Sequence, residues 1–208
     1  MHTLRRTPRR LATARLHGAR AGALVALLVC AAAAACGSDG PESAHRTVNA
    51  YITGYSYFDN TPPGSARISN PVLRTTAGGT GTYEDPITVA VGHVRSDGGD
   101  TLDWPAGTRF YVPNIRRYLI VEDTCGDGSA PQDGPCHTGY PDDAQTWLDI
   151  WIGGEGGTDR EARRCMSRIT GVWTVLVDPV PGLATEPGPV YQPDGCTPVF
   201  GNRVVTAP

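Results

Sequence analysis

The stretch Trp104-Pro-Ala-Gly-Thr-Arg-Phe-Tyr-Val-Pro113 decides the fold of this chain, together with Tyr118-Leu-Ile-Val-Glu-Asp-Thr-Cys-Gly-Asp-Gly128 and Thr146-Trp-Leu-Asp-Ile-Trp-Ile-Gly-Gly154. Each stretch contains a short run of β-branched and aromatic residues, and Gly, Pro or Asp stands where the run ends. That pattern predicts short strands separated by tight turns. Two of these strands carry a carboxylate, so we expect a small β-barrel with an acidic cleft.

Similar runs continue along the chain and predict strands at 51–58, 87–91, 109–112, 117–122, 146–152 and 172–177. One helix accompanies them. Thr158 and Glu161 form a capping box, and four apolar residues then fall on one helical face before Gly171, namely Ala162, Cys165, Met166 and Ile169. Six or seven short strands with one short helix predict an all-β barrel or sandwich in a single domain.

The N-terminal region indicates where the protein works. Arginines up to Arg20 precede an apolar run at 21–35, which is followed by Cys36. A basic segment, a short apolar segment and small residues before a cut describe a secretory signal. Ala34 and Ala35 before Cys36 also resemble a bacterial lipobox. We therefore expect a signal peptide at 1–35, a lipidated Cys36 at the outer face of the cell membrane, a polar tether at 36–47 and a folded domain at 48–208. Plain secretion is the alternative.

Four cysteines follow the predicted signal: Cys125, Cys136, Cys165 and Cys196. An even number in an exported domain argues for two disulfides, although four cysteines allow three pairings that sequence cannot separate. We favour Cys125 with Cys136, because that bond would close the irregular loop between them, and Cys165 with Cys196. No C-x-x-C pair occurs, so we expect no metal site and no cofactor.

Side-chain alternation places the candidate chemistry on one face of a strand. Over 146–152, the aliphatic residues Leu148, Ile150 and Ile152 share a face, which must be the core. Asp149 therefore lies on the opposite face, between Trp147 and Trp151. The same rule aligns Tyr51, Tyr55, Tyr57 and Asp59 along the first strand.

A carboxylate beside aromatic rings is what a sugar-binding groove requires. Ring faces stack on the C–H surfaces of sugars, and apolar neighbours raise the pKa of a carboxyl group so that it can donate a proton near neutral pH. We expect catalytic roles for Asp149, Asp123 and Asp59, and substrate-binding roles for Trp147, Trp151, Tyr55 and Tyr57. Structural roles are the alternatives: Asp149 would pair with Arg160 or cap a turn, Asp123 would bind backbone amides, and Asp59 would belong to a turn.

In order and spacing, three motifs between residues 86 and 168 resemble a known group. These are "P-x-G-T" at 105–108, "E-D-T" at 122–124 and "D-x-W" at 149–151. The chain resembles the 3D (three-aspartate) domain, the barrel of the MltA-type lytic transglycosylases and the RlpA-like proteins. The resemblance implies a double-psi β-barrel. In that family an aspartate follows the Ala-Val pair, whereas here Ala90-Val91 precedes Gly92 and His93.

The resemblance implies an exported cell-envelope protein that acts on peptidoglycan or a related polysaccharide, with Asp149 as general acid. If Asp59 faces the same groove, a glycosidase with two carboxylates is a further possibility. The competing hypothesis is a non-catalytic glycan-binding module or a protease inhibitor, which the missing aspartate at Gly92 favours. Net charge is −3 with the basic N-terminus included, which disfavours nucleic acid as a partner. We expect a monomer that meets the membrane only through its lipid anchor.

Overall fold

The computed structural model describes residues 46–192 and 194–207. The predicted signal peptide, the lipidation site Cys36 and most of the predicted tether lie outside the described residues. Within the described residues, no helix combines the length and the apolar character needed to cross a membrane.

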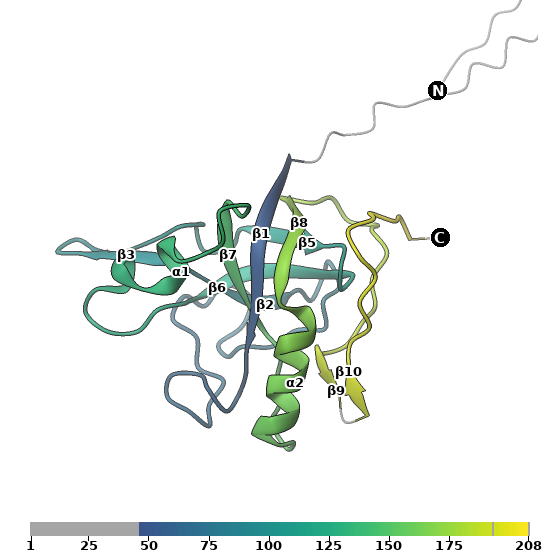
Figure 1. Ribbon diagram of the computed structural model, residues 1–208, viewed down its shortest axis with the longest axis horizontal. Helices are drawn as coiled ribbons and strands as arrows, with labels where there is room; N and C mark the ends of the chain where they lie inside the picture. Colours follow the sequence, from purple (N-terminus) through teal and green to yellow (C-terminus); the bar gives the residue numbers. More distant parts are fainter. Residues whose placement is uncertain (1–45, 193, 208) are drawn as a thin grey trace, which may run out of the picture. The chain divides into compact units, whose positions relative to one another are not determined.

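Six strands close a barrel, which confirms the all-β prediction (Figure 1). Around the barrel they follow one another as β1 (Arg46–Tyr55), β7 (Thr146–Trp151), β2 (Ile87–Val91), β6 (Arg117–Thr124), β5 (Arg109–Val112) and β8 (Gly171–Val177). β1 with β7 and β2 with β6 are parallel pairs. The connection from β1 to β2 therefore passes β7, and the connection from β6 to β7 passes β2. These two interlocked crossings make the barrel a double-psi barrel.

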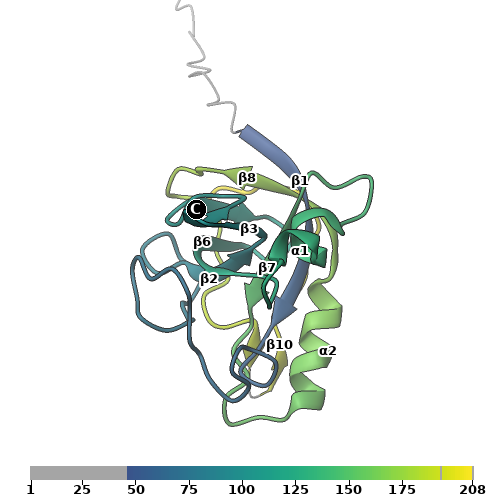
Figure 2. The ribbon, with the colours of Figure 1, turned by 90° about the vertical axis from the view of Figure 1, so that its left-hand side faces the viewer.

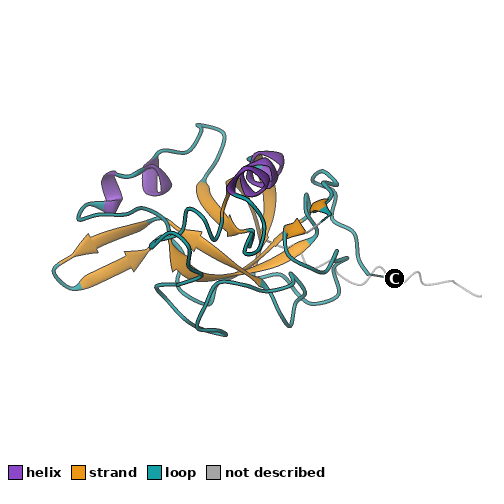
Figure 3. Cartoon of the chain, turned by 90° about the horizontal axis from the view of Figure 1, so that it is seen from below, coloured by secondary structure: helices purple, strands orange, loops and turns teal. Residues whose placement is uncertain are grey.

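Smaller elements surround the barrel. The hairpin of β3 (His93–Ser96) and β4 (Gly99–Leu102) extends from it, as Figure 3 shows. The 3₁₀ turn η1 (Pro131–Asp133) and the single-turn helix α1 (Pro135–Thr138) lie in the segment between β6 and β7. The helix α2 (Asp159–Ile169) packs along β1 (Figure 2), and the short hairpin of β9 (Tyr191–Gln192) and β10 (Gly195–Cys196) contacts α2.

The helix prediction is confirmed in detail. Thr158 is the N-cap of α2, and its hydroxyl accepts a hydrogen bond from the backbone N–H of Glu161, whose carboxylate accepts one from the backbone N–H of Thr158. This reciprocal capping box satisfies two donors that the first turn would otherwise leave unpaired. The buried face consists of the predicted residues Ala162, Cys165, Met166 and Ile169.

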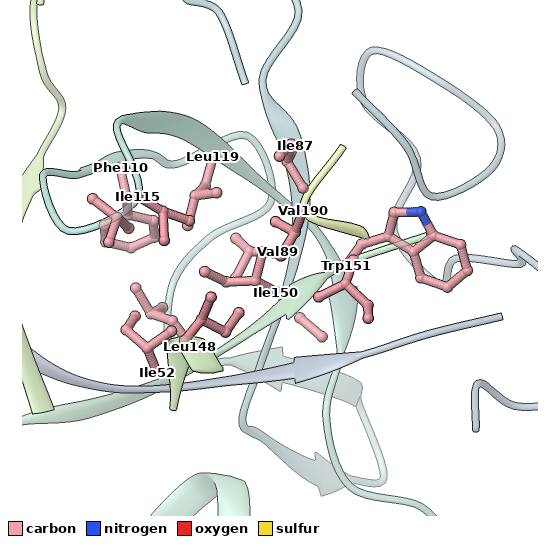
Figure 4. Close-up of a cluster of buried hydrophobic side chains, with 14 of the residues drawn as sticks. Ile52, Ile87, Val89, Phe110, Ile115, Leu119, Leu148, Ile150, Trp151 and Val190 are labelled. Carbon is pink, nitrogen blue, oxygen red and sulfur yellow. The ribbon is translucent and has the colours of Figure 1, made fainter. Parts of the chain in front are cut away.

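The aliphatic face of β7 forms the middle of the core. Leu148 and Ile150 are fully buried and lie beside Ile52 of β1 and Val89 of β2 (Figure 4). The predicted assignment of the β7 faces is therefore confirmed. Trp151 belongs to the other face, and in Figure 4 its indole extends away from these aliphatic side chains.

The first strand differs from its predicted range. β1 begins at Arg46 and ends at Tyr55, whereas the residue pattern predicts 51–58. The chain turns after Tyr55 because the carboxylate of Asp59 accepts hydrogen bonds from both the backbone N–H and the hydroxyl of Ser56, each at 2.7 Å. Tyr57 and Asp59 consequently lie in a turn and do not continue the face of Tyr51 and Tyr55, so that part of the prediction is wrong.

A buried acid fixes the loop that runs beside β6. Glu122 has no solvent exposure, and its Oε1 accepts hydrogen bonds from the consecutive backbone N–H groups of Val72, Leu73 and Arg74. Its Oε2 accepts one from the hydroxyl of Thr88 at 3.1 Å. A buried carboxylate is tolerated only when donors replace its hydration, and here the loop and β2 supply them.

Two disulfides hold the outer segments. Cys125 is bonded to Cys136 and Cys165 to Cys196, which confirms the favoured pairing. The first bond closes the loop that follows β6, and the second ties α2 to β10.

Candidate functional site: an acidic cavity around Asp149

All three predicted catalytic aspartates line one cavity of about 470 Å³. The cavity lies where the end of β1, the loop after it, β2, the end of β6 and β7 meet. Four of its lining residues are aspartates and one is an arginine: Asp59, Asp123, Asp127, Asp149 and Arg67. The cavity is therefore strongly acidic.

The side chain of Asp149 is oriented by its parallel neighbour β1. The register of β1 and β7 places Thr53 beside Asp149, and the Thr53 hydroxyl donates to Asp149 Oδ1 at 2.5 Å. Trp147 Nε1–H donates in turn to Thr53 Oγ1 at 2.6 Å. An indole N–H can only donate, so the hydroxyl hydrogen of Thr53 is directed to Asp149.

This relay determines which oxygen of Asp149 can carry a proton. Oδ1 is the acceptor of the Thr53 hydroxyl, which leaves Oδ2 as the protonation site. Oδ2 lies 3.9 Å from Cys125 Sγ. That sulfur belongs to a disulfide and has no hydrogen, so the contact does not occupy Oδ2 with a donor.

Partial burial raises the pKa of Asp149 from 3.8 to about 7, since removal from water penalises the charged form. The hydrogen bond from Thr53 lowers the pKa and opposes this effect in part, while the nearby charges of Asp59 and Asp123 raise it further. Asp149 is therefore a carboxyl group that holds a proton near neutral pH.

Asp123 accepts more hydrogen bonds than Asp149 does. Its Oδ1 accepts hydrogen bonds from the backbone N–H and the hydroxyl of Ser69 and from the backbone N–H of Thr124, at 2.8–3.0 Å. Its Oδ2 accepts one from Tyr55 Oη at 2.9 Å. Burial, followed by the adjacent Asp123 charge, raises the pKa of Tyr55 well above its usual value, which keeps the phenol as a donor. These four donors fix the position of the Asp123 side chain.

Asp59 is exposed at the cavity, and only one of its two carboxylate oxygens accepts hydrogen bonds from the described residues. Both of its hydrogen bonds from Ser56 reach Oδ1, and within the described residues no donor reaches Oδ2. Thr61, two residues on, donates to Asp127 across 3.0 Å, so the loop after β1 is joined to the loop after β6 at the cavity.

The predicted aromatic residues take different positions. Tyr55 lines the cavity, whereas Tyr57, Trp147 and Trp151 are not among its lining residues. Trp151 packs edge-on against Tyr55, with ring centroids 5.2 Å apart, and is almost fully buried. Trp147 acts through its N–H on Thr53. These indoles therefore support the wall that holds Asp149.

Two residues of the site are absent from the prediction. Thr53 lies two residues from both Tyr51 and Tyr55, so alternation alone places it on their face. The sequence therefore could have predicted that its hydroxyl lies on the same face as these rings. Ser69 lies in a loop 54 residues from Asp123 in sequence. Nothing local in the sequence indicates that contact.

Gly92 occupies the position at which the resembling families have their first aspartate. Neighbouring atoms leave no space for a side chain there. A Cβ atom added there would collide with Asp103 Oδ2 and with the backbone carbonyl of Cys136. A larger residue at position 92 would require the backbone to move. The place near Gly92 is thus occupied by Asp103, which also accepts a hydrogen bond from His137 Nδ1 at 2.7 Å.

The fold and the cavity define an all-β, disulfide-bonded double-psi barrel with a proton-holding aspartate in an acidic pocket. Comparison with known proteins adds the family. Residues 47–197 match the family described as DDB_G0273701 N-terminal domain, so the chain belongs to that family. The match runs from β1 to just beyond β10.

A relative in Dictyostelium discoideum, "Uncharacterized protein DDB_G0273701/DDB_G0273221", is 34% identical over 110 residues. The aligned region is 53% of this chain and 41% of the relative, so this chain spans less than half of the relative's length. No solved structure matched the chain.

Proposed function

We propose that this protein is an exported cell-envelope enzyme that cleaves the glycan of peptidoglycan or a related polysaccharide, with Asp149 as general acid. The observation that carries the proposal is the state of Asp149: one oxygen is held by Thr53, the other meets no donor among the described residues, and the pKa is about 7. A general acid works best when its pKa lies near the working pH.

In the proposed reaction, Asp149 Oδ2–H protonates the glycosidic oxygen, and the bond from the anomeric carbon to that oxygen breaks. Positive charge then develops on the sugar ring. The carboxyl groups of Asp123 and the exposed Asp59 line the same cavity and would stabilise that charge. Resemblance to the MltA-type enzymes suggests that Asp149 next takes a proton from a hydroxyl of the same sugar, which closes an anhydro ring.

Hydrolysis is the variant of this reaction that Asp59 favours. Its Oδ2 accepts no hydrogen bond from the described residues, so it is available to take a proton from a water molecule. In this route, Asp149 acts as the general acid and Asp59 as the general base. Mass spectrometry separates the two routes, because ring closure yields anhydro sugars and hydrolysis yields ordinary reducing ends.

A glycan-binding module without catalysis is the second candidate. It is favoured by Gly92, which replaces the first aspartate of the resembling families and has no room for one. In that case, Asp149 would bind a sugar hydroxyl and release no product.

The test is incubation of the purified chain with peptidoglycan and with cellulose, followed by mass analysis of the soluble products. The wild type and Asp142→Asn, a control in the exposed segment before β7, should release products. Asp149→Asn should retain glycan binding and lose at least about 10²-fold in rate, because an amide cannot act as the acid. Wild-type activity should fall as the pH rises through about 7, where Asp149 loses its proton. If the wild type binds glycan but releases no product at any pH, the enzyme hypothesis is refuted and the binding-module hypothesis stands.

A further inference from the structure

A second cavity adjoins the start of β7, the strand that carries Asp149. It has a volume of about 190 Å³ and is lined by Asp103, Trp104, His137, Tyr140, Gln145 and Thr146. Its size suits one small cyclic unit, since sites for larger ligands usually exceed about 300 Å³. Within the described residues it combines two aromatic rings with a histidine–aspartate pair.

The strand β7 connects the two cavities. Gln145 and Thr146, at the start of β7, line the second cavity, and Asp149 lies farther along the same strand. Four residues of strand correspond to about 13 Å. The disulfide between Cys125 and Cys136 also links them, because Cys125 lines the acidic cavity and His137 follows Cys136. Both cavities therefore adjoin β7 and the segment closed by this disulfide.

The histidine of the second cavity is held in one orientation by its partner. Asp103 Oδ1 accepts a hydrogen bond from His137 Nδ1 at 2.7 Å, and the two side chains are 20% and 28% exposed. Because Nδ1 is engaged by this carboxylate, Nε2 is the ring nitrogen left for a ligand. Nε2 has no partner within the described residues, so it can form a hydrogen bond with a ligand hydroxyl.

From this arrangement we infer that the cavity around His137 is a distal subsite for one sugar of the chain whose scissile bond lies at Asp149. Nε2 of His137 forms a hydrogen bond with a sugar hydroxyl, and the ring of Tyr140 packs on the sugar. Trp104 holds the wall, since its Nε1–H donates to Thr146 Oγ1 at 2.9 Å and its ring packs edge-on against Phe110. This inference rests on the proposed function and adds that the substrate is an oligosaccharide long enough to span both cavities.

The experiment measures affinity against chain length. Asp149→Asn prevents turnover, and calorimetry then compares chito-oligosaccharides and cello-oligosaccharides from disaccharide to hexasaccharide. The parent variant should bind long oligomers more tightly than short ones. Adding His137→Gln or Tyr140→Ala should remove about ten-fold of affinity for the long oligomers and none for the short ones, as expected for one lost hydrogen bond or stacking contact. Gln192→Ala, in the cavity between α2 and β9, is the matched control and should change neither.

Each result separates this inference from the proposed function. If Asp149→Asn binds long oligomers more tightly and both added variants keep that gain, the distal subsite is refuted while the glycan function stands. If the parent binds all lengths equally, the subsite is likewise refuted. If it binds no oligomer of either series, the subsite and the glycan function are both refuted. Thermal midpoints of the variants are measured in parallel, and His137→Gln decides alone should Tyr140→Ala fail to fold.

Discussion

Replacement of Asp149 by Asn should stabilise the protein at neutral and alkaline pH. The protonated acid accepts from Thr53 at Oδ1 and carries its proton on Oδ2. An asparagine reproduces that arrangement, with its carbonyl oxygen at the first position and its NH₂ group at the second. The variant therefore resembles the protonated protein at every pH, while the wild type must ionise a partly buried group as the pH rises.

The size of the effect follows from the pKa shift. The pKa of Asp149 rises from 3.8 to about 7 on folding, and one unit corresponds to about 1.4 kcal/mol. Because the folded pKa is raised, the stabilising contribution of the protonated form is complete below about pH 4 and is lost as the pH rises through about 7. The total loss is about 4 kcal/mol. Wild type and variant should thus be equally stable near pH 4, and the variant should be more stable by up to about 4 kcal/mol near pH 8.

Urea unfolding of both proteins across this range measures the difference directly. Asp142→Asn serves as the control, because the same chemical change in an exposed segment should give a pH-independent difference from wild type. Parallel stability curves for wild type and Asp149→Asn would refute the argument, since they would mean that Asp149 ionises as easily in the folded chain as in the unfolded one.

Other predictions concern the frame around the site and are checked by the same unfolding measurements. Glu122→Gln should cost on the order of 3 kcal/mol, because an amide cannot accept from all the donors that surround the buried carboxylate; an unchanged midpoint would contradict this. Leu148→Ala should cost about 2–5 kcal/mol through the cavity left in the core. Replacing Cys165 and Cys196 together by Ala should cost about 2–4 kcal/mol, because a loop with a sequence separation of 31 is released. Gly92→Asp should lower the midpoint, since its Cβ would collide with neighbouring atoms.

Some features of the fold could be predicted from the sequence because they depend on local residue patterns. The ranges 87–91 and 109–112 coincide with β2 and β5, since each is a compact run of strand-forming residues between turn residues. The capping box and the spaced apolar residues of α2 likewise depend on neighbours within one or two helical turns. The end of β1 was misread because the hydrogen bonds from Ser56 to Asp59 override a sequence that still looks like a strand.

The sequence by itself determined the class of fold, the apolar face of β7, the helix and the cysteines available for two disulfides, because composition and periodicity act over short distances. Only the tertiary structure decided that Asp59, Asp123 and Asp149 line one cavity, and that Trp147 orients Asp149 through Thr53. The parallel pairing of β1 with β7 joins residues about 96 positions apart in sequence. The raised pKa of Asp149 depends on that closure, since burial and neighbouring charges exist only after the barrel has formed.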